Sequence, residues 1–68
     1  MILEEFEKSF SIASKLHVKG NLEEAEKIYR DLFKYDVANS NLIFNYALVN
    51  QQLARYPLAV KLYKIAAS

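Results

Sequence analysis

The sequence contains no cysteine, and it has a single histidine, a single glycine and a single proline. Without cysteine the chain forms neither a disulfide nor a thiolate metal site, and one histidine cannot build a histidine-rich site. A single glycine also excludes the glycine-rich loops that bind phosphate groups. We therefore expect no metal, no cofactor and no small-molecule substrate.

Scarce glycine and proline, together with 53% hydrophobic residues, are typical of a compact helical protein and argue against disorder. Sixty-eight residues make at most one small domain, over residues 1–68. A core of this size supplies only about 3–5 kcal/mol without a covalent staple. The stability must therefore come from packing, either within the chain or against another copy.

A long apolar run of the kind that crosses a membrane is also lacking. The longest stretch without charge, residues 37–54, carries six amide side chains that a bilayer would penalise: Asn39, Asn41, Asn45, Asn50, Gln51 and Gln52. Residues 1–5 lack the basic flank and apolar run of a signal peptide. We expect a cytoplasmic protein that does not contact membranes.

Acidic residues are absent after Asp36. All 8 acidic residues and 6 of the 9 basic ones precede this boundary, so the two parts carry formal charges of about −2 and +3. This asymmetry would help the first half of one copy to meet the second half of another, although exposed charges each contribute little. The alternative is an accidental imbalance in a segment of a larger protein.

The residues also argue against catalysis and nucleic-acid binding. His17 has no second histidine, cysteine or paired carboxylate at a spacing that makes a metal site or a catalytic unit. The 5 tyrosines and 9 basic residues form no continuous phosphate-tracking stripe, because acids interrupt the basic residues in the first half. We expect neither an enzyme nor a nucleic-acid partner.

What the chain does contain is a pattern that recurs after thirty-four residues. Residues 20–25, followed by Tyr29, return as residues 54–59, followed by Tyr63. The same offset relates Phe10 to Phe44, and Ala13 to Ala47. A fixed period of this length indicates a repeat array, in which each helical hairpin buries its apolar face on its neighbours.

Apolar spacing and turn residues predict four helices in two antiparallel hairpins. The first helix runs from residue 2 or 3 to 19 and ends at Gly20, which adopts a left-handed conformation at little cost. Asn21 is expected to cap the second helix, and Ser40 or Asn39 the third, which runs to about residue 53. Pro57 is expected to begin the fourth helix, with Tyr56 outside it.

These residues resemble the tetratricopeptide repeat family, whose repeat of thirty-four residues is a pair of antiparallel helices. The resemblance covers residues 6–39 as one repeat and 40–68 as a second, shortened one. The matching residues are Ile12, Ala13, Leu16, Gly20, Leu22, Ala25, Tyr29 and Leu32, then Tyr46, Ala47, Tyr56, Ala59, Tyr63 and Ala66. Departures are Val37 for the usual proline, Ala54 for the turn glycine, and Ser9 and Ile43 for an early aromatic residue. The family implies an all-α fold, two stacked hairpins of a short solenoid.

The resemblance implies a concave groove that binds a protein or peptide. Its candidate residues by position are Phe10, Ser14, His17, Asn41, Phe44, Asn45, Leu48 and Gln52. Asn45 matches an asparagine with which some family members hold a terminal carboxylate, but Phe10 and Ser14 replace the lysine and second asparagine. An apolar groove that accepts an amphipathic helix or apolar segment is therefore favoured. The alternative is that these side chains are covered within the fold or by another copy.

A second hypothesis is that the protein is a self-assembling structural module. The fourth helix presents apolar residues for a homo-oligomer: Leu58, Leu62, Tyr63 and Ile65. Strain at Ala54, or opening of the 36–41 linker, would allow hairpins to exchange between copies in a domain-swapped oligomer. The segment 16–30 is similar to repeats that open bacterial scaffold proteins, and comparable repeats precede glycosyltransferase domains.

Overall fold

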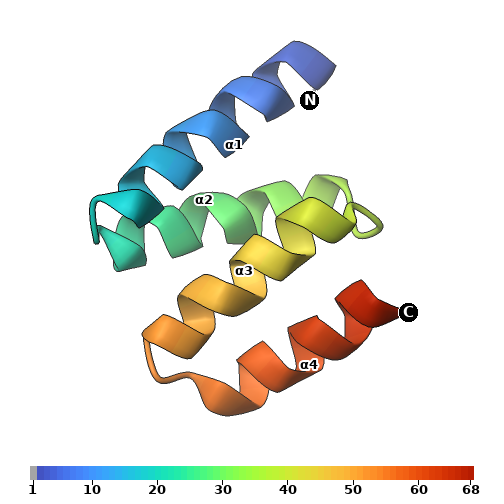
Figure 1. The fold of residues 1–68 in the computed structure, drawn as a ribbon. Coiled ribbons are helices and arrows are strands. Elements are labelled where there is room, and N and C mark those ends of the chain that lie inside the picture. Colours follow the sequence, from blue (N-terminus) through green and yellow to red (C-terminus); the bar gives the residue numbers. More distant parts are fainter. Residues whose placement is uncertain (1) are drawn as a thin grey trace.

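The computed structural model describes residues 2–68, and this part of the chain forms four α-helices without a β-strand. In chain order they are α1 (Leu3–Val18), α2 (Leu22–Tyr35), α3 (Ser40–Gln52) and α4 (Tyr56–Ala67) (Figure 1). The all-α fold of two helical hairpins is thereby confirmed.

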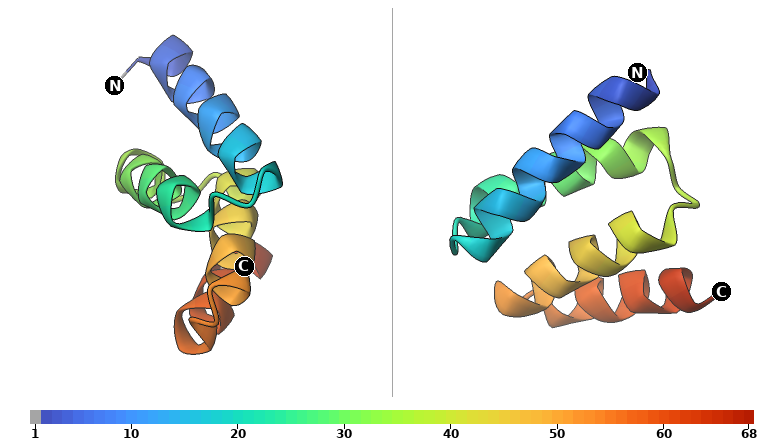
Figure 2. Two further views of the ribbon diagram at one scale, coloured as in Figure 1. Left: turned by 90° about the vertical axis from the view of Figure 1, so that its left-hand side faces the viewer. Right: turned by 45° about the horizontal axis from the view of Figure 1, so that its top comes forward.

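The helices pack in the order in which they occur in the chain. α1 packs on α2, α2 on α3, and α3 on α4. Two further views show α1 and α4 at opposite ends of this row (Figure 2). The molecule is accordingly thin, with extents of 31 × 28 × 14 Å. In such a row, the inner helices α2 and α3 are covered on two sides, and the outer two on one.

The two hairpin turns are built alike, thirty-four residues apart. Gly20 and Ala54 both have positive φ, at 87° and 61°. In the first turn the Asn21 N–H donates to the Leu16 carbonyl at 2.9 Å, and in the second the Arg55 N–H donates to the Asn50 carbonyl at 2.8 Å. A helix end with a left-handed residue and this hydrogen bond is a Schellman motif. The sequence period is therefore a period of the backbone as well.

The helix starts differ from the expectations in two places. Asn39 caps α3 as predicted, because its Oδ1 accepts the Leu42 N–H at 3.0 Å. Asn21 precedes α2, but its side chain makes no capping hydrogen bond, so that expectation is wrong. The helix α4 begins at Tyr56 rather than Pro57, with Arg55 as its N-cap residue. Proline has no N–H to lose in the first turn, so it is accommodated at the second position as well as at the first.

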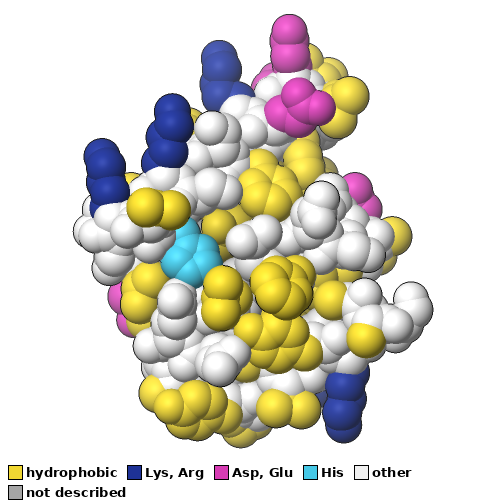
Figure 3. Space-filling model, viewed as in Figure 1, with side chains coloured by type: hydrophobic (Ala, Val, Ile, Leu, Met, Phe, Trp, Pro, Cys, Tyr) yellow, Lys and Arg dark blue, Asp and Glu magenta, His cyan; other side chains and the backbone are white. Residues whose placement is uncertain are grey.

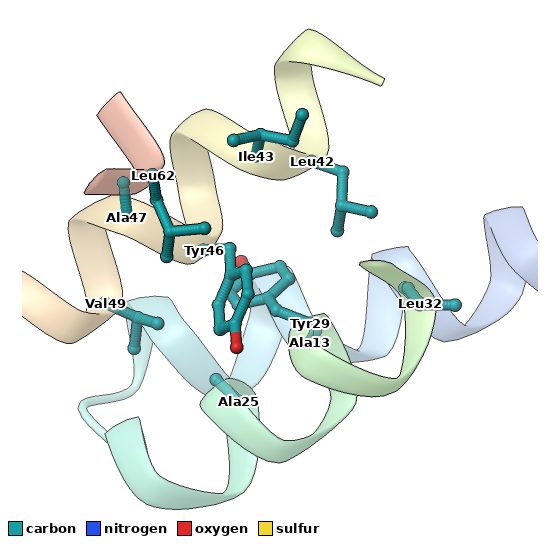
Figure 4. Close-up of a cluster of buried hydrophobic side chains, with 10 residues drawn as sticks. All are labelled: Ala13, Ala25, Tyr29, Leu32, Leu42, Ile43, Tyr46, Ala47, Val49 and Leu62. Carbon is teal, nitrogen blue, oxygen red and sulfur yellow. The ribbon is translucent and has the colours of Figure 1, made fainter. Parts of the chain in front are cut away.

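The core lies along α3 and continues into both hairpins (Figure 4). Small side chains stand where paired helices cross: Ala13, Ala25, Ala47 and Ala59 are all buried. Larger side chains fill the space between the hairpins, among them Tyr29, Leu42 and Val49, which are fully buried. The helix α3 contributes six buried residues because it lies between α2 and α4, as its apolar residues on several faces predict.

No helix in the described part of the chain combines the length and the apolar character that a membrane crossing requires.

Candidate binding groove

A hollow of about 390 Å³ lies between α1 and α3, and one α2 side chain contributes to it. Its lining comprises Ser14, His17 and Val18 of α1, Tyr29 of α2, and Asn45, Leu48 and Gln52 of α3. Five of the eight candidate groove residues thus line one hollow. Figure 3 shows the single imidazole near the middle of this face, beside apolar side chains.

The remaining three candidates have different surroundings. Phe10 is half-buried and packs edge-to-face on Tyr29, with ring centroids 5.9 Å apart, so it belongs partly to the core. Phe44 is 51% exposed, and its ring packs edge-to-face on Tyr63, with ring centroids 5.7 Å apart. Asn41 is exposed, and its carbonyl accepts the Asn45 Nδ2–H at 2.7 Å. Phe44 is therefore the accessible apolar candidate, whereas Phe10 supports the groove from within.

His17 joins three helices across the hollow. Its Nε2 lies within hydrogen-bonding distance of the Gln52 Oε1 on α3, and its Nδ1 lies 3.2 Å from the Tyr29 hydroxyl on α2. The Gln52 Oε1 is an acceptor, so these contacts suit the tautomer that donates from Nε2 and accepts the tyrosine O–H at Nδ1. Burial raises the pKa of Tyr29, which keeps this hydroxyl protonated at neutral pH.

The lining of this hollow is mostly polar, and Leu48 and Val18 are its apolar members. His17 and Tyr29 use their polar atoms on each other and on Gln52, so these atoms are largely satisfied within the protein. Leu48 is half-buried, and Val18 at the edge is 89% exposed. The Asn45 Nδ2–H donates to the Asn41 carbonyl, and within residues 2–68 the Asn45 Oδ1 has no hydrogen-bond donor. The groove thus offers apolar contact and a few polar anchors.

In the described part of the chain, the side chains that hydrogen-bond to His17 include no carboxylate, cysteine or second histidine. Within residues 2–68, no three His, Cys, Asp or Glu side chains come together in a way that could hold a metal ion. The partners of His17 are a phenol and an amide rather than a carboxylate or a nucleophile.

An ion-pair cluster joins the two hairpins, and the sequence analysis missed the contacts that Arg55 makes in it. The Arg55 guanidinium lies 3.1 Å from Glu23 and 3.7 Å from Glu26, which also lies 3.9 Å from Arg30. The Glu26–Arg30 pair was predictable from its spacing of four residues, but Arg55 is twenty-nine residues or more from its partners. Only the packing of α2 on the turn before α4 brings them together.

The self-association candidates on α4 separate into two groups. Ile65 is 39% exposed, and Leu58 and Tyr63 are half-buried. Leu62 is only 3% exposed and belongs to the core, so it is not part of the free surface. Two exposed apolar residues of the same helix, Tyr56 and Val60, were missed by the sequence analysis.

No protein-family model matches the sequence, and no curated protein matches it.

Proposed function

We propose that this protein is a non-catalytic interaction module of the tetratricopeptide kind, which binds a peptide or helix in the groove between α1 and α3. The observation that carries this proposal is the gathering of five sequence-predicted residues around one hollow: Ser14, His17, Asn45, Leu48 and Gln52. The tetratricopeptide assignment is supported by two Schellman turns thirty-four residues apart with equivalent hydrogen bonds.

The α3 surface from Leu48, in the hollow, to Phe44, beside it, favours a ligand with apolar side chains. Phe44 is an exposed aromatic residue one helical turn from Leu48, and both lie on α3. Exposed aromatic and aliphatic side chains at this spacing suit the apolar stripe of a helix or an apolar segment of a peptide. The lining of the hollow contains no lysine or arginine, which disfavours capture of a peptide carboxylate.

A displayed library of random peptides, selected on the immobilised full chain, tests this function. Selected peptides should bind the native protein and lose at least about tenfold in affinity with Phe44→Asp, because the ligand would have to desolvate a carboxylate. Lys27→Asp is the matched control, since Lys27 is exposed and lies on α2, away from Phe44 and Leu48 on α3. Circular dichroism melts establish that both variants fold. Selected peptides that bind both variants equally would refute the groove.

A second candidate function, self-assembly by hairpin exchange, is favoured by one observation. Ala54 holds a left-handed φ of 61° in the turn between α3 and α4. A side chain in this conformation costs about 1–2 kcal/mol relative to the right-handed one, and opening the turn relieves it. In a swapped dimer α4 of each copy would pack on α3 of the other. Light scattering behind size-exclusion chromatography measures whether a dimer forms.

A further inference from the structure

The outer side of α4 carries an apolar stripe made of Tyr56, Val60, Tyr63 and Ala67. These residues are spaced four, three and four apart, so they share one face of the helix. Tyr56 is 59% exposed and Val60 52%, Ala67 is exposed, and Tyr63 is half-buried. We call these four residues the α4 stripe.

The fold contains an occupied version of the same stripe. Thirty-four residues earlier, α2 carries Leu22, Glu26, Tyr29 and Phe33 at the equivalent positions. Tyr29 is fully buried, Glu26 is 3% exposed, and the other two are half-buried. The helix α3 packs on α2, with the Phe33 and Tyr46 rings 5.7 Å apart. The equivalent stripe on α2 is therefore covered by a helix of the same chain.

The helix that covers the α2 stripe shows what an occupant must present. Leu42, Tyr46 and Val49 project from α3 toward the first hairpin, and all three are buried (Figure 4). Their spacing is again four and three. The occupant of the α4 stripe is then a helix with apolar residues at this spacing.

The helix α1 of a second copy does not have the apolar residues that the α4 stripe requires. At the positions equivalent to Leu42, Tyr46 and Val49, α1 has Lys8, Ile12 and Lys15, all exposed. Seating this face on α4 would bury two lysines next to a helix whose own charges are Lys61 and Lys64. Burial of Lys8 and Lys15 beside these lysines opposes a head-to-tail stack of copies, even though the two halves of the chain carry opposite net charge.

A two-fold pairing of the α4 helix of two copies meets a similar obstacle. No acidic residue follows Asp36, so α4 has nothing on itself to pair with Lys61 and Lys64 of the other copy. The stripe is apolar and its surroundings are basic. Charge complementarity thus selects an occupant with acidic flanks.

We propose that the α4 stripe docks an acidic amphipathic helix of another protein, seated on α4 as α3 is seated on α2. Apolar residues at i, i+4 and i+7 of that helix pack on Val60 and its neighbours, and a carboxylate beside them meets Lys64, which lies closer to the stripe around the helix than Lys61 does. None of the four residues of the α4 stripe lines the hollow between α1 and α3, although the Tyr63 ring contacts Phe44 beside that hollow.

The test uses a pair of fluorescently labelled, helix-stapled peptides with the full protein. Both peptides keep the Leu42, Tyr46 and Val49 spacing of α3. One carries glutamate at the polar positions and the other carries lysine. Fluorescence anisotropy should show the glutamate peptide binding at least about tenfold more tightly than the lysine peptide. A double variant, Lys61→Glu with Lys64→Glu, should reverse this preference.

Val60→Glu tests the stripe itself, because it places on α4 the residue that α2 has at Glu26. Val60 is half exposed, so the variant should retain its melting temperature while affinity for the glutamate peptide falls at least about tenfold. Gln52→Ala in the groove should leave this affinity unchanged. The proposal is overturned by equal binding of both peptides, by no binding, or by an unchanged affinity of Val60→Glu. It is also overturned by a dimer in light scattering that Val60→Glu dissociates, because a second copy would then occupy the stripe.

Discussion

The guanidinium of Arg55 holds both carboxylate oxygens of Glu23, each at 3.1 Å, and so joins the start of α4 to the first turn of α2. The same guanidinium lies 3.7 Å from Glu26, whose side chain is 4% exposed. Arg55 therefore pairs with one exposed carboxylate and one buried carboxylate, and the two contacts differ in energy. A buried charge that loses its partner costs far more than an exposed one.

Arg55→Ala should lower the free energy of unfolding by about 1–3 kcal/mol, because Glu26 keeps only the 3.9 Å contact with Arg30. Glu23→Ala should cost less than about 1 kcal/mol, because Glu23 is 65% exposed and its ion pair is screened by water. Urea denaturation measures both values. Equal losses in the two variants would show that the exposed pair, rather than the buried carboxylate, stabilises the contact.

Ala54→Gly should raise the free energy of unfolding by about 0.5–1 kcal/mol, since glycine adopts the observed φ of 61° without strain. Gly20→Ala should lower the free energy of unfolding by a similar amount. Backbone strain alone causes this loss, because nothing lies within 4 Å of the added Cβ. Thermal melts of this matched pair measure the effect.

Ala54→Gly also tests hairpin exchange. If native copies exchange hairpins through this turn, the variant should shift the population toward monomer in light scattering. An oligomer that persists unchanged in Ala54→Gly would count against exchange at this position.

Leu62→Ala should destabilise the fold by about 2–5 kcal/mol, because it leaves a cavity at a position that is 3% exposed. Val60→Ala, two residues earlier on the same helix, should cost less than about 1 kcal/mol, because Val60 is 52% exposed. Chemical denaturation distinguishes the two. A similar loss in both variants would mean that α4 is covered on its outer side in solution.

Stability should be independent of the two buried tyrosines up to about pH 10 and should fall above it. Burial raises the pKa of Tyr29 and of Tyr46 from the ordinary value of 10.0, and for Tyr46 the neighbouring Glu26 raises it further. The unfolded chain then releases these protons first, so rising pH favours unfolding once it passes 10.

Paired measurements at pH 8 and pH 11 test this pH dependence. Tyr46→Phe should lose less stability between the two values than the native protein does, because one titrating phenol is gone. Tyr35→Phe is the control, since Tyr35 is 63% exposed. If Tyr35→Phe reduced the loss as much as Tyr46→Phe, burial of the phenol would not be its cause.

The four helices and their turns could be predicted from local patterns. Apolar residues at steps of three and four define each helix, and Gly20 and Ala54 occupy equivalent positions in the repeat. The predicted cap at Asn21 was wrong because a cap depends on a single side-chain hydrogen bond. Asn21 has the right residue type for a cap, but its side chain makes no capping bond, and no spacing rule distinguishes it from Asn39.

The sequence by itself determined the helical hairpins and the small residues at their crossings, because these follow from helical periodicity and side-chain size. Only the tertiary structure decided which apolar residues of α4 are free, placing Leu62 inside and Val60 outside. It also brought Arg55 to Glu23 and His17 to Gln52, pairs that are thirty-two and thirty-five residues apart. Contacts of this kind depend on the angle and register at which one hairpin packs on the next, and periodicity within a helix carries no information about either.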